Sequence, residues 1–255
     1  SSSWINLSSG AERSDETLFI LGLKELPVGN QKLASNADIS VPHELSQRHI
    51  TFAHCYKNQH SWKNVLGRWV QGNGGELIDL EFLNDDNGRR VAAFGNAAGF
   101  AGMALGLLAW SQQQQGVRMG PVKPYDHKDK LIAHVKAELA KCSRLPHVLV
   151  LGAKGRCGSG SIALAQACGI TQLTEWDMEE TKSGGPFNEF LDVDILVNDI
   201  YLTGKVTPYL TTGMISDADG SKSRKLSVFV DVSCDVSNRH NPFPLVNDIT
   251  SFVEP

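Results

Sequence analysis

A glycine-rich segment and a later aspartate are the first residues whose spacing points to chemistry. Gly155 and Gly158 follow the apolar run 148–151, and residues 161–168 have helical composition. Glycines at such a point let the backbone turn tightly and approach a pyrophosphate, whose charge lies against the N–H groups at the helix start. Asp177 comes about 20 residues later, where a carboxylate accepts hydrogen bonds from an adenosine ribose and repels a 2′-phosphate. The spacing predicts an NAD site; the alternative is a glycine turn that only packs.

The segment departs from the G-x-G-x-x-G fingerprint at its first position. Ala153 stands where the first glycine is expected, and Gly152 lies one residue earlier. Cys157 lies within the same turn. It is either a small residue tolerated at the helix start or a thiol that the helix start acidifies.

Residues suited to proton transfer and anion binding lie near the ends of other expected strands. Lys24 and His54 each lie at the end of an apolar strand, Glu81 lies in a third strand, and Arg89 and Arg90 flank a turn. From the pattern alone, each also has a plain structural explanation. Lys24 and Glu81 could be surface charges, His54 a structural histidine, and the arginine pair the surface of a hairpin.

Alternation and helical spacing predict the elements that would position these residues. Strands are expected over 17–23, 49–54, 76–83, 89–94, 148–151, 171–176, 193–198 and 226–232, and helices over 59–70, 95–110, 126–142 and 161–168. Ligands of open α/β sheets bind beyond the carboxyl ends of the strands, so Tyr201 and residues 232–235 should face the site. The Gly- and Ala-rich helix 95–110 is either packed closely between two domains or an ordinary buried helix.

Composition narrows the class of protein. The chain has 255 residues, 41% hydrophobic content and a net charge of −4, which gives no reason to expect nucleic acid or an anionic membrane as a partner. The five cysteines are odd in number and lack C-x-x-C spacing. With no evident signal peptide, this pattern predicts reduced thiols in a cytoplasmic protein. The scattered histidines and cysteines predict no metal site.

Five segments together resemble one family, the fungal NAD-dependent, lysine-forming saccharopine dehydrogenases. The match extends over nearly all of the chain from about Thr17, and more distantly the chain is similar to the alanine dehydrogenase group. The segments are Leu-Gly-Leu-Lys-Glu-Leu-Pro at 21–27, Phe-Ala-His-Cys-Tyr-Lys at 52–57, Gly-Arg-Arg-Val-Ala-Ala-Phe-Gly at 88–95, Gly-Arg-Cys-Gly-Ser-Gly at 155–160 and Asp-Val-Ser at 231–233.

The resemblance implies an enzyme that cleaves saccharopine with NAD and water to L-lysine and 2-oxoglutarate, the final step of lysine biosynthesis by the aminoadipate route. It implies that Lys24 accepts the proton of the secondary amine and that His54 is the acid/base of imine hydrolysis, with Glu25 and Glu81 nearby. The implied saccharopine-binding residues are Gln59, Arg90, Phe94, Ser233, Cys234 and Asp235. The implied NAD-binding residues are Arg89, Gly155, Arg156, Asp177, Thr181, Tyr201 and Val232.

The chemistry agrees with these residue types. Oxidation of a C–N centre needs a neutral amine and therefore a base, a role open to a lysine whose pKa is lowered by burial. Hydrolysis of an imine needs a group that exchanges protons near neutral pH, as histidine does. A substrate with three carboxylates needs cations, and Arg90 could bind one of them through two parallel hydrogen bonds.

The expected architecture is α/β, with two Rossmann-like domains, parallel sheets and an interdomain cleft. We expect a partial catalytic and substrate domain over 1–115, a connection with an interdomain helix over 116–146, and a partial NAD-binding domain over 147–255. The resemblance implies missing segments at both ends. Some relatives pair the cysteine equivalent to Cys157 with one at the position of Asp199, a disulfide that this chain lacks. We expect a monomer; the alternatives are an alanine-dehydrogenase-like enzyme and an inactive NAD-binding fragment.

Overall fold

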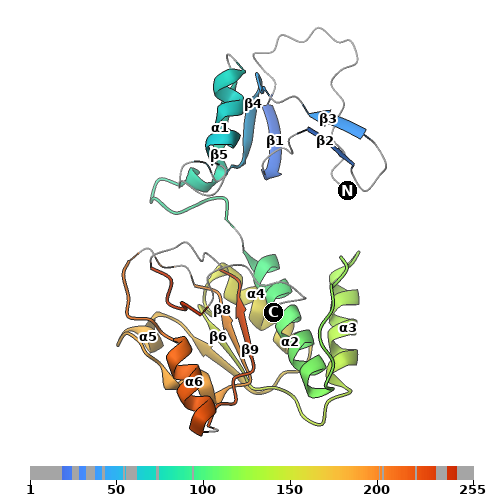
Figure 1. The fold of residues 1–255 in the computed structure, drawn as a ribbon, viewed down its shortest axis with the longest axis vertical. Helices are drawn as coiled ribbons and strands as arrows, with labels where there is room; N and C mark the ends of the chain where they lie inside the picture. The colour runs from blue at the N-terminus through green and yellow to red at the C-terminus, as the bar shows by residue number, and fades with distance from the viewer. Residues whose placement is uncertain are drawn as a thin grey trace. The chain divides into compact units, whose positions relative to one another are not determined.

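The chain forms two compact units, residues 1–93 and residues 94–255. The structure, a computed structural model, describes residues 19–24, 29–32, 38–41, 44–53, 55, 62–72, 75–93, 95–200, 202, 204–221, 223–233 and 240–245. Each unit has its own parallel sheet (Figure 1). This agrees with the expected α/β class.

The first unit is built on three parallel strands in the order β1-β4-β5. These strands are β1 (Phe19–Lys24), β4 (Arg48–Phe52) and β5 (Glu76–Asp79). A short antiparallel pair, β2 (Gly29–Lys32) and β3 (Asp38–Val41), accompanies them. Helix α1 (Trp62–Gln71) lies between β4 and β5 in the chain, as a parallel crossover requires.

Helix α1 is held to the sheet by an aromatic contact. Trp69 is buried, and its ring lies edge-on to the buried ring of His49 on β4, with 5.3 Å between centroids. Such edge-to-face pairs stabilise by more than the area they bury. Burial, together with the charge of Arg68, lowers the pKa of His49. His49 is therefore a core residue.

Two expected strands of the first unit differ in the structure. The strand expected over 76–83 is β5 only as far as Asp79, and a 3₁₀ turn, η2 (Leu80–Phe82), follows it. The Asp79 carboxylate causes the change by accepting the Glu81 N–H at 3.0 Å, which caps the turn. The expected strand over 89–94 is reduced to a single bridge between Asn84 and Arg90, because Asp85 closes a tight turn by accepting the N–H of Arg89.

The second unit is a four-stranded parallel sheet in the order β7-β6-β8-β9. Its strands are β6 (Val148–Leu151), β7 (Leu173–Trp176), β8 (Ile195–Asn198) and β9 (Val228–Asp231). Its helical segments are α2 (Asn96–Gln114), α3 (Lys128–Leu139), α4 (Arg156–Ala167), α5 (Met178–Thr181), η3 (Asn188–Asp192) and α6 (Thr212–Ser221). The strand order reverses between β6 and β8, so the sheet is doubly wound.

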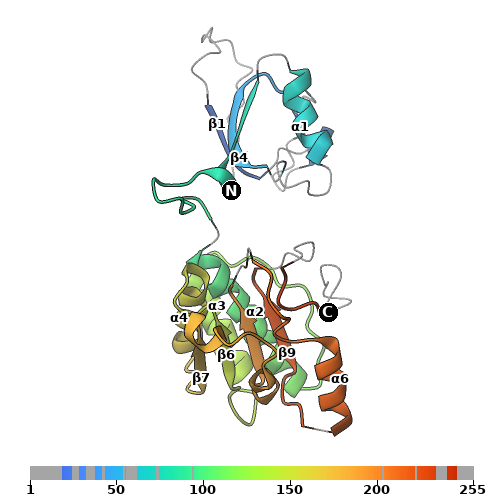
Figure 2. The same cartoon turned by 90° about the vertical axis from the view of Figure 1, so that its left-hand side faces the viewer.

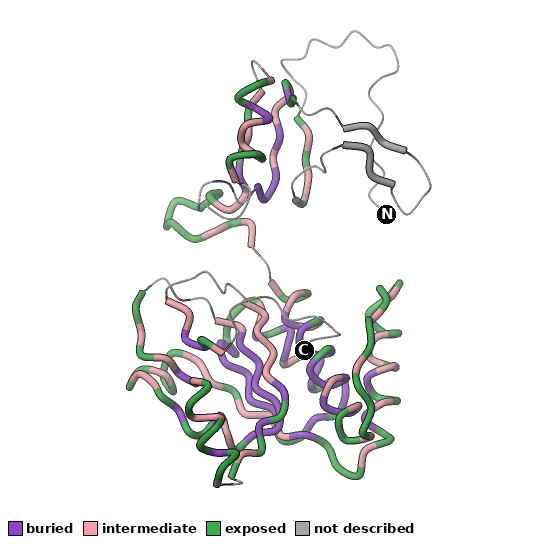
Figure 3. Tube along the Cα trace, in the orientation of Figure 1, coloured by how far each residue is buried: buried purple, intermediate pink, exposed green. Residues whose placement is uncertain are grey.

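Alternate residues of each central strand enter different cores. Val148 and Val150 pack with α2, α3 and α4, whereas Leu149 and Leu151 pack with η3 and α6. Figures 1 and 2 show these two layers of helices on opposite faces of the sheet. The central strands are therefore buried on both faces (Figure 3), which explains their continuous apolar runs.

Helix α2 is part of the second unit and not of the first. Glycines let it approach α4 closely, because a Cβ on Gly99 would collide with the Cys157 carbonyl and one on Gly160 with the Asn96 carbonyl. On another part of α2, Gly102 faces Val232, where an added Cβ would lie 2.6 Å from a side-chain methyl. The division of the chain consequently falls at residue 93, before α2, whereas the sequence predicts a boundary at 115.

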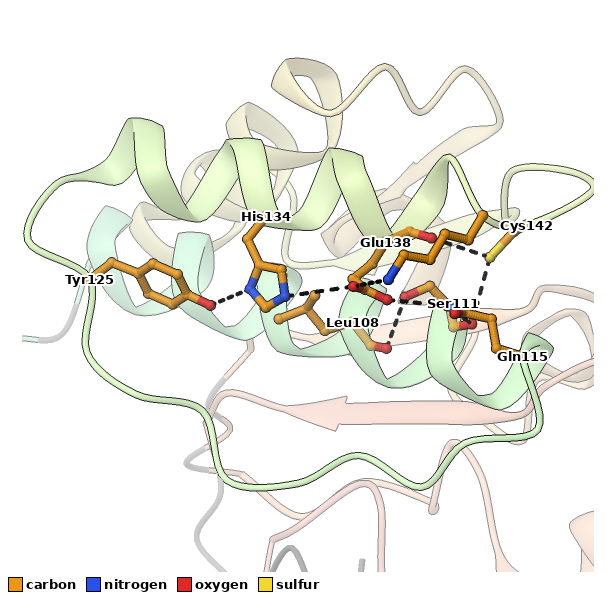
Figure 4. Close-up of polar contacts among 8 residues, drawn as sticks. Leu108, Ser111, Gln115, Tyr125, His134, Glu138 and Cys142 are labelled. Atoms are coloured by element: carbon orange, nitrogen blue, oxygen red, sulfur yellow. Dashed lines mark hydrogen bonds and ion pairs between the residues drawn. The ribbon is translucent and has the colours of Figure 1, made fainter.

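Helix α3 is tied to α2 by a chain of polar contacts (Figure 4). The Tyr125 hydroxyl lies 2.5 Å from His134 Nδ1, and His134 Nε2 lies 3.9 Å from Glu138 Oε1. Gln115, at the end of α2, donates to Glu138 Oε2 at 3.2 Å, and Lys141 bonds the other oxygen at 2.5 Å. These bonds lower the pKa of Glu138. The network fixes the connecting segment 117–127 to the helical layer.

Candidate functional site

The turn between β6 and α4 requires glycine. Gly152 has a φ of +88°, a backbone angle that residues other than glycine rarely adopt. A Cβ at this position would also lie 2.7 Å from an Ile200 methyl group. A Cβ on Gly158 would collide with the Gly152 carbonyl. The positive φ thus falls at Gly152, one residue before the position that the fingerprint assigns to the first glycine, and Ala153 is buried.

Helix α4 begins at this turn, five residues earlier than the sequence predicts. Gly155 is its N-cap, and the N–H of Ser159 donates to the Gly155 carbonyl at 3.0 Å. The N–H groups of the first helical turn have no partner within a helix, and they carry its positive dipole end. This cradle of backbone donors, kept open by residues without a Cβ, fits a pyrophosphate.

Asp177 follows β7 and lies beside the same turn. Its Oδ2 accepts the Lys154 N–H at 2.9 Å, and its Oδ1 accepts the Met178 N–H at 2.9 Å. In return, the Glu180 side chain accepts the N–H of Asp177 at 2.7 Å. The Glu180 N–H also donates to the Asp177 side chain, which completes a capping box. A carboxylate has about four acceptor positions, so these three bonds leave capacity for a hydroxyl of a ribose.

The other residues predicted to hold NAD come from neighbouring strand ends. Arg156 is the first residue of α4, Thr181 donates its hydroxyl to the Asp177 carbonyl at 3.0 Å, and the Val232 N–H donates to Asn198 at 3.0 Å. Ser233 follows Val232 directly beyond β9. With Gly155 and Asp177 they occupy the carboxyl edge of one parallel sheet. The predicted residues Tyr201, Cys234 and Asp235 lie outside the described residues.

Asp199 and Ser161 also lie at this edge, although the sequence predicts neither as a site residue. Asp199 follows β8, and its Oδ2 lies 2.7 Å from the Ser161 hydroxyl. Burial, opposed by that hydrogen bond and reinforced by the charge of Asp231, raises the pKa of Asp199 to about 6. The only signal in the sequence was an acidic residue directly after a buried strand.

The environment of Cys157 argues against an acidified thiol. Burial and the nearby Asp199 raise the pKa of Cys157, and they outweigh the charge of Arg156 and a backbone bond to Gly99. Cys157 is therefore a weak nucleophile here, in agreement with the alternative of a small residue at the helix start.

The first unit also gathers candidate residues at the carboxyl edge of its sheet. Lys24 ends β1 and pairs in register with Phe52, near the end of β4. Asp79, at the end of β5, accepts the N–H of Ala53 at 3.3 Å as well as that of Glu81. The buried Asp79 therefore fixes the segment before residue 54 and the turn that carries Glu81.

Arg90 lies beside Glu81 at this edge. Its Nη1 is 3.7 Å from Glu81 Oε1, and the Glu81 side chain is largely buried, at 10% exposure. Arg89 is exposed in the turn that Asp85 closes. Glu25, His54, Gln59 and Phe94 lie outside the described residues, as does the side chain of Lys24. The roles of all these residues stay predictions.

The described residues include neither a membrane-spanning helix nor a group of metal ligands. Among them, no helix combines the length and apolar character needed to cross a bilayer. Within the same ranges, no three histidine, cysteine or acidic side chains are grouped so that they could hold a metal ion.

A doubly wound parallel sheet with a glycine turn at its reversal point defines the second unit as a Rossmann-type α/β fold, in which dinucleotides bind at this edge. In sequence, the chain is a relative of the fungal saccharopine dehydrogenases described as NAD(+), L-lysine-forming. It is 48% identical to that of Yarrowia lipolytica over 94% of this chain and 63% of the relative. It is 46% identical to that of Emericella nidulans, over 93% of this chain and 61% of the relative. It is 45% identical to that of Candida albicans, over 92% of this chain and 63% of the relative.

The chain therefore spans about 61–63% of the length of these curated relatives. The identities confirm the resemblance seen in the sequence and favour it over the alanine dehydrogenase alternative. No family model matches the chain. Among solved structures, an L-alanine dehydrogenase is similar with a TM-score of 0.43 and 14% identity, over 84% of this chain and 55% of that one.

Proposed function

We propose that this chain carries catalytic and NAD-binding segments of an NAD-dependent, lysine-forming saccharopine dehydrogenase. The observation that supports this most is identity of 42–48% with such enzymes over at least 92% of the chain. The reaction would oxidise the secondary amine of saccharopine and hydrolyse the resulting imine to L-lysine and 2-oxoglutarate. When bound, NAD supplies the acceptor for the hydride.

In this proposal Lys24 takes the proton of the secondary amine, and His54 handles protons during water addition and collapse of the adduct. The pairing of Lys24 with Phe52 supports it, because the carboxyl ends of β1 and β4 then lie at one edge. Asp79 adds support by holding the Ala53 N–H, directly before His54. Glu25 and Glu81 would tune the proton affinity of the pair.

The substrate carboxylates require cations and hydrogen-bond donors. Arg90 would bind one carboxylate, and its approach to Glu81 supports a fixed orientation of the guanidinium. Gln59, Phe94, Ser233, Cys234 and Asp235 would complete the saccharopine site.

For the cofactor, the glycine turn and the start of α4 would hold the pyrophosphate, and Asp177 would bind the adenosine ribose. Arg89, Arg156, Thr181, Tyr201 and Val232 would contact other parts of NAD. A cytoplasmic location and a monomeric state remain predictions from the sequence.

The test has two separate readouts on the same protein. Binding of NADH, followed by the quenching of tryptophan fluorescence, reports on the cofactor site. Formation of NADH after addition of saccharopine, followed by its absorbance, reports on the reaction, with the Yarrowia lipolytica enzyme as a positive control. NADH binding together with turnover of saccharopine is the expected result. Binding without turnover would reduce this chain to an NAD-binding fragment.

The catalytic assignment is tested by Lys24→Met. Loss of a general base should slow the chemical step by roughly 10²–10⁴-fold, with a much smaller change in saccharopine binding. Lys130→Met is a matched control, because Lys130 lies exposed at the start of α3, paired with Asp126. Wild-type turnover in Lys24→Met at its optimal pH would refute the role of Lys24.

A further inference from the structure

Asp199 lies where the order of the second sheet reverses. It directly follows β8, and its N–H donates to the Leu151 carbonyl, at the end of the neighbouring β6, at 2.9 Å. The glycine turn lies against it, because a Cβ on Gly152 would be 3.2 Å from the Asp199 carbonyl carbon. In doubly wound sheets this reversal point forms the crevice that receives a dinucleotide. Asp199 therefore lies next to the proposed pyrophosphate cradle.

The Ser161 hydroxyl lies between two acceptors. It is 2.7 Å from Asp199 Oδ2 and 3.0 Å from the carbonyl of Gly99 on α2, both within hydrogen-bond distance. A hydroxyl carries one proton, so with ionised Asp199 it can donate to only one of these oxygens. If Oδ2 carries a proton, Asp199 donates to Ser161 and Ser161 donates to Gly99. Both contacts are then hydrogen bonds, and the geometry fits the neutral acid.

The surroundings of Asp199 also disfavour a second negative charge. Its other oxygen, Oδ1, is buried and has no hydrogen-bond partner among the described residues. Among the described residues, the charged and titratable groups that interact with it are Asp231 from β9 and the Cys157 thiol from α4, and from α2 the Gly99 carbonyl contacts its partner Ser161. Arg156, the nearest cation on α4, acts on Cys157 and is exposed. Burial and Asp231 accordingly raise the pKa of Asp199 to about 6.

A bound pyrophosphate would add further negative charge beside this carboxyl group. Two like charges in a partly buried site disfavour ionisation of the weaker acid, which is the carboxyl group. We propose that Asp199 is protonated in the dinucleotide complex, so that binding of a pyrophosphate-containing ligand takes up one proton from solvent. This inference rests on the proposed NAD site and adds to it a residue that links cofactor affinity to pH.

Linkage gives the sign of the effect. With a pKa of about 6, Asp199 in the free protein is half protonated near that pH and increasingly ionised above it, whereas in the proposed complex it keeps the proton to higher pH. Affinity is therefore highest below pH 6 and falls as pH rises, by up to about tenfold per pH unit where one proton is taken up. ADP-ribose is a suitable probe, because it carries the pyrophosphate and both riboses but not the cationic nicotinamide.

Titration calorimetry of ADP-ribose in buffers of different ionisation enthalpy measures the proton uptake directly. At pH 7 we expect uptake approaching one proton per ligand, and a Kd at pH 8.0 at least about tenfold above that at pH 5.5. Asp199→Asn keeps the shape of the side chain but cannot ionise. It should bind with a Kd that changes less than about twofold over this range and with little proton uptake.

Asp231→Asn is a second variant that keeps Asp199. Because it removes the charge that raises the Asp199 pKa, the fall in affinity should begin at lower pH. A wild-type Kd independent of pH, or equal pH dependence in Asp199→Asn, would overturn the inference. Absence of ADP-ribose binding at every pH would overturn both it and the NAD site. Proton-linked binding without turnover of saccharopine would leave the inference intact and reject only the proposed reaction.

Discussion

The Asp177 carboxylate binds the backbone of Lys154, with 2.9 Å between Oδ2 and the amide nitrogen. This bond joins the end of β7 to the glycine turn. One side chain thus shapes the pyrophosphate cradle and also stands where the adenosine ribose is expected. A substitution at Asp177 must therefore be designed to separate the two roles.

Asp177→Asn should narrow the preference for NAD over NADP by at least about tenfold, or about 1.4 kcal/mol. The change removes the charge that repels a 2′-phosphate but keeps one side-chain oxygen as an acceptor for the backbone N–H groups of Lys154, Met178 and Glu180. Asp177→Ala should show the same change in preference with a larger loss of NAD affinity. Kd values for NADH and NADPH measure both effects.

Glu180→Gln is the control for the two Asp177 variants. Glu180 accepts the N–H of Asp177, and its substitution leaves the Asp177 carboxylate in place. Its preference should equal that of the wild type. If Asp177→Asn also kept the wild-type preference for NAD over NADP, Asp177 would not bind the adenosine ribose.

Cys157 should react slowly with a thiol-alkylating reagent, and more slowly still with NADH bound. Burial and Asp199 raise its pKa and so reduce the reactive thiolate. In Asp199→Asn the thiolate fraction, and with it the rate of labelling at a given pH, should rise. Mass spectrometry of the peptide that contains Cys157 gives the rates. Equal rates with and without NADH would place the thiol outside the cofactor site.

Gly160→Ala should lower the free energy of unfolding by about 1–3 kcal/mol, the usual cost of overpacking. The added methyl group would collide with the Asn96 carbonyl and force α2 away from α4. Gly120→Ala is the matched control, because a Cβ there has no neighbour within 4 Å. Chemical denaturation of both variants measures the difference. Equal stability would show that the two helices separate at no cost.

Arg144→Ala should destabilise the second unit by about 2–4 kcal/mol at pH 7, somewhat below the cost of breaking a fully buried pair, because Arg144 is half exposed. Arg144 binds both oxygens of the buried Asp194 at 2.6 and 2.7 Å. Burial alone would raise the pKa of Asp194, but bonds from Arg144 and the His147 N–H bring it below its usual value.

The pH dependence of that cost follows from the sign of the shift. Because the folded state lowers the pKa of Asp194, the stabilisation is present above the ordinary aspartate pKa and is lost as pH falls through the folded value. The difference between wild type and Arg144→Ala should therefore shrink in acid. Lys182→Ala removes an exposed ion pair with Glu179 and should change the stability little at any pH.

The sequence by itself determined the central strand β6 of the second sheet and the glycine turn that follows it. The run 148–151 is apolar at every position, as a strand buried on both faces requires, and Gly152, Gly155 and Gly158 fix the turn after it. Asp177 directly follows β7, as the sequence predicts, because strand lengths leave little freedom in its position. These features depend on local order along the chain.

Only the tertiary structure decided which distant groups share an environment. The boundary at residue 93 depends on the close contacts of α2 with α4 at Gly99 and Gly160. A Gly- and Ala-rich composition predicts close packing of α2, but it does not tell whether the partner lies in the same unit or in the other one. Likewise, Asp79 shortens β5 through a bond to Glu81 that β-propensity does not encode. The raised pKa of Asp199 depends on burial beside Ser161 and Asp231, residues far from it in sequence. Burial and electrostatic fields arise from the packed whole, so residue types and spacing alone could not predict them.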